Sequence, residues 1–460
     1  MKKRMYKIMA LAMTAAMVVP MAAQTTAFAA DDKEITYWNI AVESPDKDIV
    51  TAAVDKFNKE TKSGYTVNQV AIQNDTYKEK LVIAMSSGEC PDMYSSWSGG
   101  PMYEYIDSGF AQPIDDLLDQ SDIKDKLLDA AIEQGSYNGH VYAIPYLNVS
   151  LAGIFYNKDM FKQYGLEEPK TLADLENICA TLKENGITPF ALANASKWTG
   201  SMYFMSLAAR YGGLEPFQNA VAGTGKFTDD CFIKAGEKIQ EWVNNGYFPD
   251  GVNSLSEDDG QAKQLMYQET AGMLLCGSWY AGTFQTDSEE FYQKIGWFPF
   301  PAIDDSDADP TIQIGTVGDQ FICFNCEGDK LAAAFECATD HLSDEVADIT
   351  YSNNKIAPVK DAGDHISDPV VKEIFDAAQE ASSIQLWYDQ YLPTSVASAH
   401  LDGLQEVFGL TKTPQEAQEE MQKAMDEYLS TKSDSGAADD TAEEATDDAA
   451  ADDAAADDAE

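Results

Sequence analysis

The sequence predicts an α/β protein of two lobes, each a mostly parallel sheet flanked by helices, with multiple crossovers joining the lobes. Three observations support this prediction. Apolar strand-like runs alternate with amphipathic helical segments over residues 35–97, which is typical of parallel sheets with right-handed crossovers. A later apolar run is interrupted by Pro145, which cannot donate to a sheet ladder. The 460 residues are enough for two or three domain-sized units.

Residues 1–30 have the pattern of a secretory signal peptide and are set apart from the fold. A basic start at residues 2–7 precedes an apolar run over 8–23, and a small-x-small cleavage signal follows at 27–29. We therefore expect the mature chain to be secreted and to act outside the cell.

The first lobe is predicted from strands and helices that alternate along the chain. The strands are expected at residues 35–40, 65–72 and 92–97, and the helices at 46–62 and 76–87. In parallel sheets, ligands bind beyond the carboxyl ends of the strands. The segments 39–44 and 97–100, which follow the first and third strands, are therefore candidates for a binding site.

Residues 142–161 are expected to carry the chain from the first lobe to the second. After Pro145 the apolar run resumes at 151–156, and a turn leads into a helix that begins near Met160. The second lobe is then predicted from helices and short strands at 171–185, 189–194, 202–211, 232–244, 262–269 and 271–280.

The later part of the chain is expected to cross between the lobes twice more, near 296–301 and near 344–353. A strand at 315–325 and a helix at 331–342 would belong to the first lobe, and the last helices are expected at 368–381, 395–408 and 413–431. From residue 433 the sequence is mostly Ala, Asp and Glu, which predicts disorder. The predicted division is lobe 1 from 31–146 and 298–344, lobe 2 from 147–297 and 345–432, and a disordered acidic tail at 433–460.

The charge and the cysteines exclude several kinds of partner and site. A net charge of −47 argues against nucleic acid, which would be repelled. The seven cysteines, an odd number scattered through apolar segments, predict buried thiols rather than disulfides, Cys323 and Cys326 included. The four histidines show no metal-ligand spacing, so we expect no metal and no cofactor. Acidic loops at 250–260 and 305–309 are interpreted first as solvated turns, with calcium as the weaker alternative.

Several stretches of the chain resemble the sugar-binding group of extracellular solute-binding proteins of ABC transporters. They are Ala143-Ile-Pro-Tyr followed by Ile154-Phe-Tyr-Asn-Lys-Asp, the segment 90–116 that opens Cys-Pro-Asp-Met-Tyr, and Gly277-Ser-Trp. The likeness covers roughly residues 35–429. It implies a two-lobed periplasmic-binding-protein-like fold, capture of a sugar in an interlobe cleft by hinge closure, and delivery to an ABC permease. Members of this group are usually tethered by a lipidated cysteine, and no lipobox cysteine stands here, although we expect association with the cell surface.

Four tryptophans fall where the resemblance places the cleft: Trp97, Trp198, Trp279 and Trp387. Each stands beside polar or turn residues rather than inside an apolar run. Aromatic rings stack on the flat apolar faces of sugars, while amides and carboxylates bind the hydroxyls. For each tryptophan alone, a place in the core is an equally good interpretation.

The polar candidates for the cleft are Asn39, Glu43, Ser98, Asn148, Asp319 and Asp389. Each carboxylate and amide has two atoms that could bridge neighbouring hydroxyls of one sugar ring. In so acidic a chain, solvated surface is at least as good an interpretation for each carboxylate. Asp319 stands out because it interrupts an otherwise apolar stretch.

We therefore expect a monomer that binds a neutral sugar, of oligosaccharide length, without acting as an enzyme. Two alternatives stay open. A secreted glycoside hydrolase would need two carboxylates across the cleft, and no pair is singled out by the sequence. A binding protein for a cationic peptide would also suit an acidic cleft.

Overall fold

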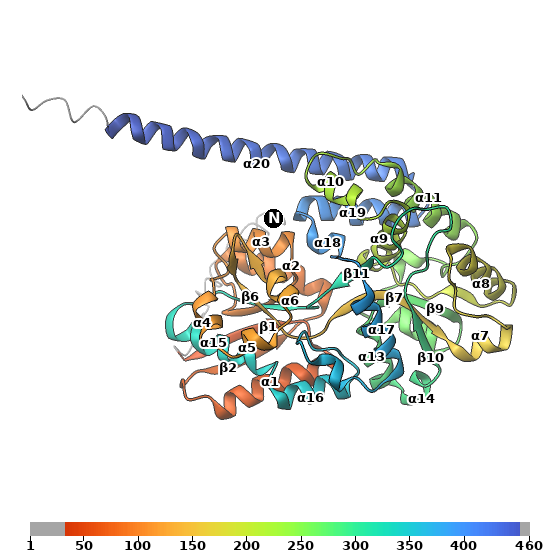
Figure 1. The fold of residues 1–460 in the computed structure, drawn as a ribbon, viewed down its shortest axis with the longest axis horizontal. Coiled ribbons are helices and arrows are strands. Elements are labelled where there is room, and N and C mark those ends of the chain that lie inside the picture. Colours follow the sequence, from red (N-terminus) through yellow and green to blue (C-terminus); the bar gives the residue numbers. More distant parts are fainter. Residues whose placement is uncertain (1–32, 451–460) are drawn as a thin grey trace, which may run out of the picture.

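The computed structural model describes residues 33–450, with side chains to residue 432, and shows two lobes side by side (Figure 1). The predicted signal peptide lies outside the described residues. Each lobe has its own sheet, and helices cover both sheets, so the predicted two-lobed α/β class is confirmed. Among residues 33–450, no helix combines the length and the apolar character that crossing a bilayer requires.

Lobe 1 contains a five-stranded sheet in the order β2-β1-β3-β12-β6. Helix α1 shows why the chain folds this way locally: its apolar side chains recur on one face, which is buried against the sheet. The strands are β1 (Glu34–Asn39), β2 (Thr66–Ala71), β3 (Met93–Ser96), β6 (Ala143–Pro145) and β12 (Phe321–Phe324), with a small hairpin of β4 (Ser136–Tyr137) and β5 (His140–Val141). The helices are α1 (Asp46–Glu60), α2 (Asn74–Ser87), α3 (Gly100–Asp107), α4 (Asp115–Asp119), α5 (Ile123–Lys126), α6 (Asp129–Gln134), α15 (Gly328–Asp340) and α16 (Asp344–Ser352).

Lobe 2 is built on a six-stranded sheet in the order β13-β11-β7-β9-β8, with β10 also paired to β7. Its central strands are buried on both faces, which explains their uninterrupted apolar sequences. The strands are β7 (Ser150–Asn157), β8 (Thr188–Phe190), β9 (Ala271–Gly277), β10 (Ile295–Phe298), β11 (Gln313–Thr316) and β13 (Ile384–Gln385). The helices are α7 (Lys158–Tyr164), α8 (Leu172–Glu184), α9 (Trp198–Gly212), α10 (Glu215–Val221), α11 (Asp230–Asn244), η1 (Val252–Ser254), α12 (Gln261–Tyr267), α13 (Tyr280–Asp287), α14 (Glu289–Tyr292), η2 (Ala362–His365), α17 (Pro369–Glu380), α18 (Tyr388–Tyr391), α19 (Thr394–Phe408) and α20 (Pro414–Ala450).

The sheets are mixed, not mostly parallel as predicted. Strand β12 is antiparallel to both of its neighbours in lobe 1, and β7 is antiparallel to β9, β10 and β11 in lobe 2. A parallel neighbour requires a crossover connection within one sheet, whereas β7 and β12 enter their sheets from the other lobe. The direction of these strands is therefore set by where the chain crosses between the lobes. The alternation of strands and helices along the sequence does not contain this information.

The return to lobe 1 lies later than residue 298, where the sequence placed it. Strand β10 pairs with β7, and β11 pairs with β7 and β13, so both belong to lobe 2. The predicted strand over 315–325 is two strands in different sheets, β11 and β12. The break falls at 317–320, where Gly318, Asp319 and Gln320 interrupt the apolar run.

The third crossing also lies later than the predicted 344–353. Helix α16 packs against α1 of lobe 1, and the backbone N–H of Val149 donates to the Ile356 carbonyl at 2.7 Å. An isolated bridge between Leu127 and Val359 keeps the chain on lobe 1 beyond α16. The chain then reaches lobe 2 with η2 and α17, and α17 packs against β10.

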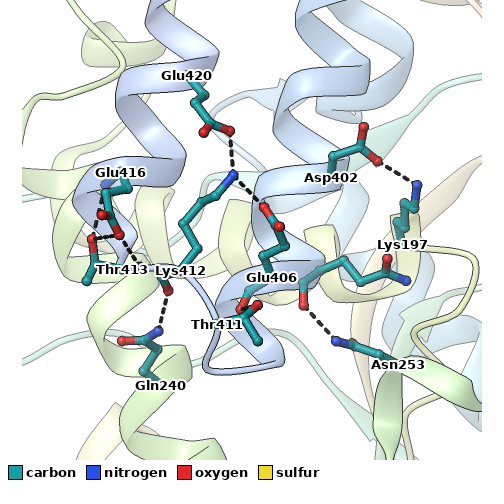
Figure 2. A network of polar contacts seen from close by, with 11 residues as sticks. Lys197, Gln240, Asn253, Asp402, Glu406, Thr411, Lys412, Thr413, Glu416 and Glu420 are labelled. Atoms are coloured by element: carbon teal, nitrogen blue, oxygen red, sulfur yellow. Dashed lines mark hydrogen bonds and ion pairs between the residues drawn. The ribbon is translucent and has the colours of Figure 1, made fainter.

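The last two helices form a hairpin whose junction is held by polar contacts (Figure 2). Thr413 and Glu416 form a reciprocal cap at the start of α20: the Glu416 N–H donates to Thr413 Oγ1 at 3.2 Å, and the Thr413 N–H donates to Glu416 Oε2 at 2.9 Å. The Lys412 ammonium contacts Glu406 and Glu420.

Helix α20 continues to Ala450 and extends past the body of the molecule (Figure 1). The sequence predicted disorder from residue 433. The structure instead has helix over 433–450, and residues 451–460 lie outside the described part. Ala is the strongest helix former and Glu is a good one, so an Ala-rich acidic stretch can continue a helix that has already begun.

The seven cysteines are free thiols, six of them buried, as the sequence predicts. Trp242 and Trp297 are also buried in the core.

Candidate functional site

A cavity of about 190 Å³ lies between the two lobes. Six of the sequence-predicted site residues line it: Trp97, Trp198, Trp279, Asp319, Trp387 and Asp389. They come from five separate stretches of the chain, which the crossings bring together. The cavity adjoins a larger groove of about 750 Å³ between α2–α3 and α18–α19, with which it shares Lys78, Trp97, Asp389 and Gln390.

One wall of the cavity is aromatic and belongs to lobe 2. The ring of Trp279 lies between those of Trp198 and Trp387, with centroids 6.1 Å from each and interplanar angles of 58° and 67°. Gly277 leaves space for this ring, because a Cβ there would stand 1.9 Å from the Trp279 ring. Trp387 is the buried member of this wall, whereas Trp198 and Trp279 are only partly buried.

Trp198 is held in place by the residue before it. Lys197 has a left-handed backbone conformation, with φ of 65°, and it immediately precedes helix α9. Its ammonium reaches Asp402 on α19 at 2.5 Å (Figure 2). The turn into α9 is thereby tied to a neighbouring helix, and Trp198, the first residue of α9, points into the cavity wall.

The opposite wall belongs to lobe 1 and carries Trp97, which follows strand β3. The Lys78 ammonium on α2 lies 4.7 Å from the centroid of the Trp97 ring, a cation–π distance. The same ammonium lies 3.6 Å from Asp389 of α18. Both residues line the cavity and the larger groove, so the pair stands at their junction.

Asp319 lies in the segment between β11 and β12 and lines the cavity with 8% of its surface exposed. Its backbone N–H donates to the Asn148 carbonyl at 2.7 Å. Burial raises the pKa of the Asp319 carboxyl to about 7; Lys355 lowers this pKa in part, and Asp46 raises it. The Lys355 ammonium is itself buried and forms an ion pair with Asp46.

Two further carboxyls line the cavity from the loop before α12, Glu257 and Asp258. Burial raises the pKa of Glu257 to about 7, against the opposing effects of the Tyr280 hydroxyl, which donates to it, and of Lys263. Burial also raises the pKa of Asp258 above its usual range.

The remaining predicted site residues lie outside the cavity. Asn39 is buried, and its Oδ1 accepts from the Ala41 N–H at 3.0 Å. Glu43 is exposed and lines neighbouring surface pockets on the other side of the cavity. Ser98 is buried at the turn behind Trp97.

Asn148 is buried where the crossing segments meet. Its Oδ1 accepts from the Ile356 N–H at 2.8 Å, its carbonyl accepts from the Asp319 N–H, and its Nδ2 lies 3.5 Å from Ser278 Oγ. Asn148 therefore positions Asp319 and the segment that leads to Trp279.

Direct contacts join the lobes around the cavity. The Asp75 N–H of lobe 1 donates to the Asp258 carboxylate of lobe 2 at 3.1 Å. The Lys263 ammonium of lobe 2 lies 3.6 Å from the Glu43 carboxylate of lobe 1. Both contacts span the two lobes, so the structure corresponds to a closed arrangement of them.

A second set of contacts joins the lobes beside the larger groove. Glu104 on α3 accepts from the Thr394 N–H at 3.0 Å and from the Thr394 hydroxyl at 2.6 Å, which caps helix α19 from the other lobe. A Cβ at Gly100 would lie 2.2 Å from the Leu392 carbonyl oxygen. Only glycine allows this backbone approach.

Ile40, which also lines the cavity, lies in the predicted segment 39–44. The sequence did not indicate the other residues of the cavity: Asp46, Asn74, Lys78, Met202, Met205, Glu257, Asp258, Gln320 and Gln390. Gln320 and Gln390 each follow a predicted site residue, Asp319 and Asp389, so the sequence could have indicated them. Lys78 is inside a helix pattern, and Glu257 and Asp258 are inside an acidic loop, where only the fold reveals what they face.

Comparisons with known proteins identify the family and agree with the fold. The family model described as bacterial extracellular solute-binding protein matches residues 41–336, more than half of the chain. An ABC transporter extracellular-binding protein of Pyrococcus horikoshii is 32% identical over 228 residues, which is 49% of this chain and 50% of the relative. The multiple sugar-binding protein of Streptococcus mutans is 30% identical over 178 residues, 36% of this chain and 39% of the relative. The chain thus spans about half the length, or less, of the curated relatives it matches first.

Solved structures match most of the described fold. A structure from work on xylan utilization by the thermophilic bacterium Caldanaerobius polysaccharolyticus has a TM-score of 0.78 at 29% identity, over 85% of this chain and 99% of that one. A chitin oligosaccharide binding protein shares the fold, with a TM-score of 0.78 at 23% identity, over 86% of this chain and 98% of that one. The chain belongs to the bacterial extracellular solute-binding proteins.

Proposed function

We propose that this protein captures a saccharide in the cavity between its lobes and delivers it unchanged to an ABC permease. The observation that carries the proposal is the aromatic wall of Trp198, Trp279 and Trp387, which faces Trp97 across a cavity rimmed by carboxylates. Aromatic faces stack on the apolar faces of sugar rings, and carboxylates accept hydrogen bonds from hydroxyls. The sugar-binding relative and the extracellular family support the same conclusion.

The ligand is of oligosaccharide length in this proposal. The central cavity of about 190 Å³ is smaller than the roughly 300–1,000 Å³ typical of pockets for larger ligands. The adjoining groove of about 750 Å³ shares four residues with it, so a chain bound in the cavity can continue past the Lys78–Asp389 pair.

Binding works by hinge closure. Ligand in the cavity contacts Trp97 from lobe 1 and the aromatic wall from lobe 2, so it has a higher affinity for the closed form than for the open form. The predicted leader takes the chain outside the cell, where it acts as a monomer at the cell surface and presents its closed form to the permease.

Thermal unfolding with a panel of saccharides tests the proposal. A ligand at a hundred times its dissociation constant adds about 2.7 kcal/mol to the free energy of unfolding, which raises the melting temperature by a few degrees at this chain length. We expect such a shift with one class of oligosaccharide, which chromatography then recovers intact. Cleaved sugar in the same samples would show a glycoside hydrolase instead, and a shift with no saccharide would refute the proposal.

A further inference from the structure

The cavity has more negative charge than its own lysines compensate. Asp319, Glu257 and Asp258 all line it. The neighbouring ammonium groups already form ion pairs with other carboxylates: Lys355 with Asp46, Lys78 with Asp389, and Lys263 with Glu43 and Asp287. Within residues 33–450, none of the three carboxyls forms an ion pair with a lysine, although Lys355 and Lys263 lie near enough to lower the pKa of Asp319 and of Glu257 in part.

Of the three carboxyls, Asp319 has the strongest need for a positively charged or hydrogen-bonding partner. It is more than nine-tenths buried, it lines the cavity, and within residues 33–450 its carboxylate has neither a hydrogen bond nor an ion pair. A buried carboxylate without a partner is costly, and the cost is removed by a proton or by a cation. The same burial raises the pKa of the Asp319 carboxyl to about 7, so that about half of the molecules carry a proton on it at neutral pH.

The arrangement of side chains around Asp319 does not suit a metal ion as this cation. A divalent cation needs several oxygen ligands that converge on one point. Over the described residues, no three side chains among His, Cys, Asp and Glu are placed to hold one. The carboxyls are instead spread around a cavity with tryptophan on two walls, a setting that favours an organic cation because ammonium groups also bind aromatic faces.

We propose that the saccharide bound here carries a protonated amino group, as in an amino sugar, and that Asp319 accepts its hydrogen bonds while Glu257 and Asp258 supply further negative charge. This inference rests on the proposed function, since it specifies the ligand of the same cavity. A hydroxyl would satisfy Asp319 with one neutral hydrogen bond, whereas an ammonium also removes the excess charge, and charge-assisted hydrogen bonds are the stronger kind.

Matched ligands test the inference on the unmodified protein. Isothermal titration calorimetry at about pH 7 compares glucosamine, galactosamine and mannosamine, and their β-linked oligomers, with the N-acetylated and the unsubstituted sugars of the same stereochemistry. We expect the amine to bind at least tenfold more tightly than its N-acetylated partner in at least one series. Because Asp319 and Glu257 hold protons near this pH, binding of the amine should also release protons, seen as a dependence of the measured heat on the buffer.

Variants assign the effect to the cavity. Asp319→Asn keeps the shape of the side chain and removes its charge, so it should reduce binding of the amine at least tenfold more than it reduces binding of the N-acetylated sugar. Asp305→Asn makes the same change of charge on an exposed turn and should alter neither affinity.

The outcomes separate the two proposals. Unsubstituted or N-acetylated sugars that bind as tightly as the amines would overturn the inference and leave the proposed function intact. Equal loss of all sugars in Asp319→Asn would also overturn it, because Asp319 would then serve binding in general. Basic peptides that bind while no saccharide does would overturn both.

Discussion

At the scale of single residues, Trp279 stands at the centre of the aromatic wall, with Trp198 and Trp387 on either side. Its ring occupies the space that Gly277 leaves free. We expect Trp279→Ala to weaken saccharide binding about tenfold or more, equivalent to about 1.4 kcal/mol, because it removes the stacking surface and leaves its two neighbours unsupported.

Titration of the saccharide that stabilises the wild-type protein measures this loss. Trp38→Ala is the matched control, since Trp38 packs in lobe 1 outside the cavity and should affect stability without affecting affinity. An unchanged affinity in Trp279→Ala would show that the ligand binds elsewhere.

Asp319 makes a prediction about pH. Its pKa is raised by burial to about 7, with Lys355 lowering it and Asp46 raising it, so the folded protein retains a proton that the unfolded chain loses near pH 4. The free energy of unfolding therefore falls as pH rises from about 4 to about 7, by at most about 1.4 kcal/mol per pH unit from this group.

Asn does not titrate, so Asp319→Asn should be more stable than the wild type at about pH 8, and the advantage should disappear near pH 4. Urea denaturation without ligand at these two pH values measures the difference. If the difference in free energy of unfolding between the variant and the wild type is the same at both pH values, burial does not raise the pKa of Asp319.

At the scale of elements, helix α3 of lobe 1 provides the cap of helix α19 of lobe 2 through Glu104 and Thr394. Caps of this kind are worth about 0.5–2 kcal/mol, and this one exists only when the lobes are closed. Glu104→Ala should therefore shift the ligand-free protein toward an open form and weaken ligand binding severalfold, with little change in the unfolding of either lobe.

Small-angle X-ray scattering without ligand should show a larger radius of gyration for Glu104→Ala than for the wild type. Glu89→Ala, an exposed change on the same lobe whose side chain has no partner among the described residues, should behave as the wild type. Identical scattering from all three proteins would mean that the cap does not contribute to closure.

Most individual helices and strands were predictable from the sequence, but the pairing of the strands in the sheets was less predictable. The periodic apolar residues of α1 and the buried runs of β7 and β9 identify those elements directly. In contrast, β11 and β12 form one apolar stretch in the sequence although they belong to different lobes. Pairing depends on contacts across long sequence separations, which local periodicity does not encode.

The site shows the same division. Aromatic residues at strand ends marked four tryptophans that the fold brings to one cavity. Asn39 and Asn148 were equally polar and equally close to strand ends, yet both are buried in backbone contacts. The direction of a side chain at a strand end depends on the turn that follows, and that turn is set by the packing of the other lobe.

In the molecule as a whole, the ligand binds in the cavity between the lobes, and the contacts across this cavity hold the lobes closed. Ligand binding should therefore leave the outer faces of the lobes unchanged. It should protect the backbone in the segments that line the cavity and in those that cross between the lobes.

Hydrogen–deuterium exchange with and without the saccharide that gives the largest thermal shift measures this protection. We expect added protection in peptides that contain Trp97, Trp198, Trp279 and Asp319, and in residues 387–390, with α8 and α11 on the far side of lobe 2 unaffected. Protection confined to other segments, with none around the cavity, would contradict ligand binding in this cavity.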